Sequence, residues 1–173
     1  MQQINYRWCT DILIALKIFV LSKTETGKLF DRFDSSWPPD ILPKIKNIKV
    51  YEIERDKWLL AADKMMVAVQ VRGLLVPFLG KQEELQRFPS VTIDRGALKF
   101  VCNGAKVMRP GIINFDSFKK GEIVVVKDQT HGKGVAVGLA LEDSEVAKAM
   151  TKGYVIDTIH YLTDKIWEAY KRI

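Results

Sequence analysis

The feature that most constrains the fold is a series of short apolar runs in the second half of the chain, separated by turns rich in glycine. The expected strands cover residues 90–93, 107–115 with a break at 109–111, 122–127, 135–141 and 154–162. One or two helical turns are expected at 97–103, and a terminal helix at 165–172. Many short strands at close spacing are typical of a small β-barrel.

The first half begins with an apolar run at residues 12–21, in which Lys17 is the single charge. Ten residues are too few to span a bilayer, so the run predicts a buried strand. Residues 1–10 are expected to form a loosely attached extension. Ser22 and Glu25 have the spacing of a capping box, which predicts a helix that begins there and ends near Phe33.

Three further short runs follow, at residues 50–53, 58–62 and 65–71. Charged two-residue turns separate them, which predicts an antiparallel meander. Pro77 marks the next segment as an edge strand or an exit from the sheet, because proline cannot donate to a sheet ladder. The predicted class is α+β, with an α/β domain at 1–89 and a mainly β pseudo-barrel at 90–173.

The charge of the chain is mildly basic, with a formal net charge of +6 and a pI of about 9.3. Such an excess favours anionic partners such as RNA, and it is spread evenly over both halves. The two cysteines, Cys9 and Cys102, lie far apart and form no zinc-binding pattern, so two buried thiols in a reducing cytoplasm are expected.

Four segments of the second half are distinctive in their order and spacing: 94–97 (DRGA), 103–112 (NGAKVMRPGI), 118–126 (FKKGEIVVV) and 136–138 (AVG). Through these segments the second half resembles the PUA family of small RNA-binding barrels. Two further segments are similar to the malignant-T-cell-amplified-sequence proteins, their archaeal relatives and the start of ligatin. These segments are 88–94 (FPSVTID) and 159–167 (IHYLTDKIW). The resemblance implies a pre-PUA domain packed on a C-terminal PUA barrel.

The resemblance also implies a function. Its members bind the small ribosomal subunit, act near initiator tRNA and have no known catalytic site, and the eukaryotic members pair with a separate translation factor. For this chain it implies a cytoplasmic, archaeal-type factor that binds tRNA or rRNA and lies at no membrane. The alternatives are an accessory protein that delivers RNA to a modifying enzyme, and a protein-docking module.

The RNA site implied by the resemblance covers the first barrel helix, the loop and strand that follow, and the last strand. The expected RNA-binding residues are Gly96, Ala97, Lys99, Asn103, Gly104, Ala105, Lys106, Arg109, Pro110, Gly111 and His160. Glycines let a strand approach closely and cations bind phosphate. Alternatively, the glycines serve tight turns, the lysines are solvated and His160 is packed, while Phe100 and Met108 are expected in the core.

Catalysis finds no support in the sequence. Neither a phosphate-binding glycine loop nor a paired-histidine metal motif is present, so no cofactor, metal or enzyme activity is expected. In the docking alternative, Trp37, Trp58 and Phe78 are the candidate anchors, unless they belong to the core. Lys119 and Lys120 either extend a basic surface or form a solvated face.

Overall fold

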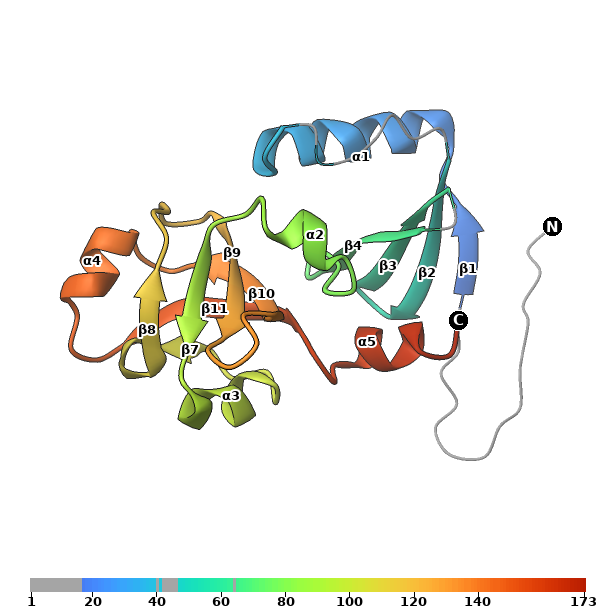
Figure 1. Ribbon diagram of the computed structural model, residues 1–173. Helices are drawn as coiled ribbons and strands as arrows, with labels where there is room; N and C mark the ends of the chain where they lie inside the picture. Colours follow the sequence, from blue (N-terminus) through green and yellow to red (C-terminus); the bar gives the residue numbers. More distant parts are fainter. Residues whose placement is uncertain (1–16, 40, 42–46, 64) are drawn as a thin grey trace.

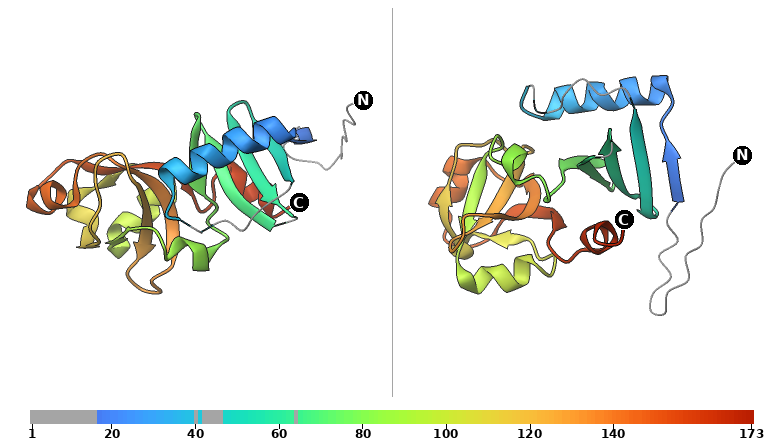
Figure 2. Two further views of the ribbon diagram at one scale, coloured as in Figure 1. Left: turned by 90° about the horizontal axis from the view of Figure 1, so that it is seen from above. Right: turned by 45° about the vertical axis from the view of Figure 1, so that its right-hand side comes forward.

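The computed structural model describes residues 17–39, 41, 47–63 and 65–173, and the strands of these residues form two sheets (Figure 1). The first sheet has the order β1-β2-β3-β4-β5, and the second has the order β7-β11-β10-β9-β6-β8. The second sheet curls into a nearly closed pseudo-barrel, which confirms the predicted α+β class. The two lie side by side in all three views (Figure 2).

The first sheet is the predicted meander, since each strand pairs antiparallel with the next. Its strands are β1 (Lys17–Val20), β2 (Ile48–Glu54), β3 (Lys57–Ala62), β4 (Met65–Val71) and β5 (Leu74–Pro77). As predicted, Pro77 lies on an edge strand. β1 forms the opposite edge, and its Ile18 and Val20 are exposed, so the expectation of a buried strand is wrong for the described part of the apolar run. The rest of that run lies outside the described residues, as does the predicted 1–10 extension.

Helix α1 (Lys23–Ser36) runs along one face of this sheet (Figure 1). It begins with the predicted capping box, in which the N–H of Glu25 donates to Ser22 Oγ and the N–H of Ser22 donates to Glu25 Oε2. The helix buries Leu29 and Phe33 against the sheet. A short helix, α2 (Gln82–Leu85), then leads into the barrel.

The strands of the barrel follow the predicted order. It contains β6 (Ser90–Ile93), α3 (Arg95–Val101), β7 (Val107–Met108), η1 (Arg109–Gly111), β8 (Ile112–Phe115), β9 (Ile123–Asp128), β10 (Gly134–Ala140), α4 (Ser144–Ala149) and β11 (Tyr154–Tyr161). As predicted, the Arg-Pro-Gly segment interrupts one long strand. Gly104, with φ of +83°, ends the α3 segment in the left-handed conformation that glycine tolerates best.

The terminal helix α5 (Lys165–Tyr170) leaves the barrel and packs against β2 and β3 of the first sheet (Figure 1). Trp167 of this helix faces Phe78 of the first half, with ring centroids 5.8 Å apart. The largest apolar core therefore spans both sheets, and it includes Val125 and Val137 of the barrel beside Leu59 of the first sheet.

The turn between β11 and α5 is fixed by the buried carboxylate of Asp164. Its Oδ1 accepts the N–H of Trp167 at 2.7 Å, and its Oδ2 accepts the N–H of Tyr161 at 3.2 Å. His160 Nδ1 hydrogen-bonds to the same Oδ2 at 2.6 Å, and the His160 ring stacks on Phe78. One carboxylate thus directs the chain from the barrel back to the first sheet.

Helix α5 belongs to the predicted second domain but packs on the first sheet. The division of the chain into domains at 1–89 and 90–173 therefore stays a prediction. No helix among the described residues is both long enough and apolar enough to cross a membrane.

We expect Asp164→Ala to lower the free energy of unfolding by about 2–4 kcal/mol, because it removes a helix cap and leaves the buried His160 without its partner. Urea unfolding followed by circular dichroism measures this loss. Glu168→Ala, on the same helix but outside the junction, should change stability by less than about 0.5 kcal/mol. Equal losses in the two variants would contradict the role given to Asp164.

Candidate RNA-binding groove

A groove of about 760 Å³ opens between helix α3, the β7–η1 segment and the start of β11; we call it the α3–β7 groove. It brings together several residues predicted for the site, which are Gly96, Ala97, Ala105, Lys106, Pro110 and Gly111. The predicted Lys99, Asn103, Gly104, Arg109 and His160 do not line it. Of these, Lys99 and Asn103 are exposed near the end of α3, close in sequence to the groove.

The walls of the groove carry exposed apolar side chains. Phe100 is 65% exposed, Tyr154 is 55% exposed and Met108 is 48% exposed. The expectation that Phe100 and Met108 belong to the core is therefore wrong. On β7, buried Val107 alternates with Met108, which points outward as strand geometry requires. Tyr154 was not predicted as a site residue, since it reaches the groove only because β11 pairs with β7.

Lys106 supplies positive charge at the groove. Its Nζ lies 5.9 Å from the centroid of the Tyr154 ring and 3.5 Å from Asp157 Oδ1. An exposed ion pair of this kind contributes little to stability, so the ammonium group can exchange its partner at small energetic cost. Lys106 is therefore suited to contact an anion that enters the groove.

Arg109 has a different role, because its guanidinium is bound within the barrel. Nη1 donates to the carbonyl of Ile112 at 3.0 Å and Nη2 to the carbonyl of Lys148 at 3.3 Å, while the group lies over the Phe115 ring. These contacts tie η1 to β8 and to the end of α4. Arg109 thus stabilises a wall behind the groove, and the predicted phosphate contact would compete with this role.

Two of the predicted glycines are required by close packing. A Cβ on Gly111 would lie 2.7 Å from the Cβ of Ala97, so α3 rests directly on η1. A Cβ on Gly104 would lie 2.8 Å from the ring of Tyr161. Close packing therefore accounts for both glycines without an RNA strand, and Gly104, with φ of +83°, also serves the tight turn that was the alternative to an RNA contact.

His160 occupies the packed position that was the alternative to a nucleotide contact. Its side chain is 0% exposed, between Phe78 and Asp164. A fully buried ring cannot reach a nucleotide at the surface of this structure, so we leave His160 out of the proposed RNA site. A sequence pattern could not show this, because the covering residue, Phe78, comes from the first half of the chain.

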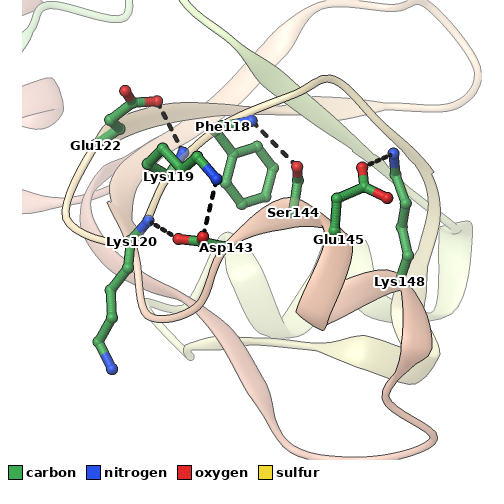
Figure 3. Close-up of polar contacts among 8 residues, drawn as sticks. All are labelled: Phe118, Lys119, Lys120, Glu122, Asp143, Ser144, Glu145 and Lys148. Carbon is green, nitrogen blue, oxygen red and sulfur yellow. Dashed lines mark hydrogen bonds and ion pairs between the residues drawn. The ribbon is translucent and has the colours of Figure 1, made fainter.

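The basic turn after β8 is held by acidic partners (Figure 3). Lys119 Nζ lies 3.0 Å from Asp143 Oδ2, and the N–H of Lys120 donates to Asp143 Oδ1. The Lys120 side chain pairs with Glu142. Both lysine side chains are exposed, at 72% and 66%, so they form the solvated face that was the alternative, with local acids that offset their charge. The hydrogen bonds from Lys120 and Lys119 lower the pKa of Asp143 below its ordinary value of 3.8.

The candidate docking anchors lie mainly in the core. Trp37 and Phe78 are buried, and Trp58 is half-buried with its ring edge-on to Phe19. The prediction that these residues present a docking surface is therefore wrong for Trp37 and Phe78.

The cysteine that the structure describes, Cys102, is half-buried rather than fully buried. Its burial raises the pKa of its thiol. Cys9 lies outside the described residues. Within the described part of the chain, no three His, Cys, Asp or Glu side chains are grouped to hold a metal ion.

Comparison with known proteins identifies the barrel and its relatives. The PUA domain family matches residues 89–162. An uncharacterized protein of Methanocaldococcus jannaschii is 34% identical over 87% of this chain and 95% of its own length. Translation machinery-associated protein 20 of Saccharomyces cerevisiae is 30% identical over 74% of this chain and 75% of its own length.

Two further comparisons cover most of the chain. Human malignant T-cell-amplified sequence 2 is 28% identical over 89% of each chain. The crystal structure of a PUA domain from Aeropyrum pernix has the same fold, with a TM-score of 0.78 at 21% identity, over 92% of this chain and 95% of that one.

We expect Arg109→Gln to lower the free energy of unfolding by about 1–3 kcal/mol, because two backbone carbonyls lose their charged donor. Lys106→Gln should change stability by less than about 0.5 kcal/mol, since its ion pair is exposed. Urea unfolding of both variants measures the difference. A larger loss for Lys106→Gln than for Arg109→Gln would reverse the roles assigned here.

Asp143→Asn should destabilise the protein at neutral pH. Since the folded-state pKa of Asp143 is lowered, its contribution to stability is present above 3.8 and is lost as pH falls through the lowered value. The difference between parent and variant should therefore shrink from pH 7 to about pH 2, as measured by urea midpoints across that range. A difference that keeps its size in acid would rule out the carboxylate charge as its source.

Proposed function

Because the chain belongs to the family of PUA-domain proteins that includes translation machinery-associated protein 20, we propose that it binds RNA and acts with the translation machinery. Within that role, the proposed targets are tRNA or the rRNA of the small ribosomal subunit. The proposed action is binding rather than catalysis, in the cytoplasm and together with a separate translation factor. The proposed domains are 1–89, a pre-PUA domain, and 90–173, the PUA domain.

The observation that supports RNA binding most directly is the combination of exposed aromatic rings and positive charge in one groove. Phe100 and Tyr154 are the large exposed rings of the α3–β7 groove, and the Lys106 ammonium lies beside the Tyr154 ring. Proteins that bind single-stranded RNA stack unpaired bases on such rings and contact the backbone with nearby cations. An exposed apolar surface rimmed by polar groups is also a common mark of a binding site.

The groove favours a single-stranded segment over a regular duplex. In an A-form helix the bases are stacked on one another, so their faces are not available to Phe100 or Tyr154. Loops and ends, in which bases can turn outward, present those faces. We therefore propose that the groove takes an unpaired nucleotide from a structured RNA, and that Lys99, Lys106 and Asn103 contact its backbone or edges.

The combined substitution Phe100→Ala and Tyr154→Ala should weaken RNA binding, because base stacking on an aromatic ring contributes about 1–3 kcal/mol per base. Both side chains are exposed, so the fold should tolerate their loss. Fluorescence anisotropy with tRNA, a single-stranded oligonucleotide and an RNA duplex measures the change. Val20→Ala removes an equally exposed apolar group from the first sheet and should bind as the parent does.

The physiological target needs a separate assay. Co-sedimentation of the parent protein with small ribosomal subunits or with tRNA, lost in the double variant, would agree with a role in translation. Co-purification with an RNA-modifying enzyme in place of subunits would instead favour the accessory role. Equal RNA affinity of the parent and the double variant would show that the groove is not the RNA site.

A further inference from the structure

One acidic side chain outside the groove holds cations from both sheets. The carboxylate of Asp157, on β11, lies with Oδ1 3.5 Å from Lys106 Nζ and with Oδ2 3.9 Å from an Nη of Arg72. Lys106 belongs to the barrel, whereas Arg72 belongs to the β4–β5 turn of the first sheet. We call Lys106 and Arg72 the Asp157 cation pair. The Asp157 cation pair lies where the side of the barrel that carries the groove meets the first sheet.

The backbone of Arg72 is fixed from two directions. Two guanidinium nitrogens of Arg32, on α1, donate hydrogen bonds of 2.7 Å, one to Gln70 Oε1 and the other to the carbonyl of Gly73. The N–H of Arg72 donates to the carbonyl of Asp56 at 3.1 Å. The β4–β5 turn therefore has a set position relative to α1 and the β2–β3 turn.

The conformation of this turn is unusual for an arginine. Arg72 has a φ of +51° and Gly73 a φ of +77°, the left-handed pair of a two-residue hairpin turn in which asparagine or glycine is preferred at the first position. The Arg72 side chain is nevertheless 61% exposed, so packing in a core does not account for an arginine at this position. An unfavourable backbone that presents an exposed cation is a reason to look for a ligand.

The cation pair continues the groove toward the first sheet. On one side, Lys106 lies beside the exposed Tyr154 ring, which belongs to the groove. On the other side, Asp157 connects Lys106 to Arg72. Tyr154, Lys106 and Arg72 therefore follow one another across the surface, in an order that suits a base followed by backbone phosphates.

We propose that Arg72 is an RNA-binding residue contributed by the first sheet. An RNA strand with one base in the α3–β7 groove continues past Lys106, and Arg72 contacts the phosphate of a neighbouring nucleotide. The inference rests on the proposed RNA-binding function and extends it to a second part of the chain. The planar guanidinium of arginine binds phosphate through two parallel hydrogen bonds, which gives this contact direction as well as charge.

In this arrangement Asp157 acts as an internal substitute for phosphate. In the free protein it holds the Lys106 and Arg72 side chains near the path proposed for the RNA strand. Both ion pairs are partly exposed and hence weak, so a phosphate can replace the carboxylate without loss of a buried interaction. Since Asp157 keeps its negative charge near the bound strand, it also lowers the affinity for RNA.

The test uses the full chain and a fluorescent single-stranded RNA of roughly 12 nucleotides, the length range of single-strand binding sites. Arg72→Gln should weaken binding about threefold to tenfold near 0.1 M salt, and it should reduce the slope of log affinity against log salt by about 0.7, the value for one phosphate contact on a single strand. Lys49→Gln removes an exposed cation from the start of β2, at the opposite end of the strands from Asp56 and Arg72, and should change neither quantity.

Asp157→Asn separates RNA binding from a structural role of the ion pair. If Asp157 competes with phosphate, this variant binds the RNA more tightly than the parent. If the ion pair of Asp157 with Arg72 only joins the barrel to the first sheet, Asp157→Asn and Arg72→Gln should lower the melting temperature alike. Asp157→Asn should then gain no affinity for the RNA, and this outcome would overturn the inference.

The Lys106→Gln variant distinguishes the two proposals. If it weakens binding while Arg72→Gln keeps the affinity and salt slope of the parent, the groove remains the RNA site and only the inference about Arg72 fails. If the parent does not bind the RNA, the proposed function and the inference about Arg72 both fail.

Discussion

The stacking of Phe78 on His160 is the contact on which the arrangement of the two sheets depends. Phe78 comes from the end of the first sheet and His160 from the last barrel strand, and both are buried in the core that the sheets share. Asp164 holds the other side of His160 and begins α5, which returns to the first sheet. At the other end of β5, the β4–β5 turn lies near Lys106, because Arg72 and Lys106 both contact Asp157.

Local signals in the sequence were sufficient to predict the elements and their order. The capping box at Ser22, the meander and the break at Arg109 all depend on neighbouring residues, so they could be recognised without tertiary contacts. The terminal helix was also predicted, but its packing partner was not. Its contact with β2 and β3 joins residues far apart in the chain, and no periodicity encodes such a pairing.

The site was predictable as a segment but not as a set of side chains. The resemblance located residues 96–111, and many of them line one groove. Which side chain is free depends on contacts from elsewhere: Arg109 is bound by the carbonyls of Ile112 and Lys148, whereas Phe100 lies on the outer face of α3. Tyr154 could be added only after the pairing of β7 with β11 was known.

The pairing of surface lysines with neighbouring acids has a consequence for how the protein meets its ligand. Lys119, Lys148 and Lys171 each have a carboxylate within 3.0 Å, so their fields are largely cancelled a short distance from the surface. The modest net charge then produces little long-range attraction. Encounters with a polyanion will be governed by diffusion and by the orientation of the two molecules, and their rate will depend only weakly on ionic strength compared with that of a strongly basic protein.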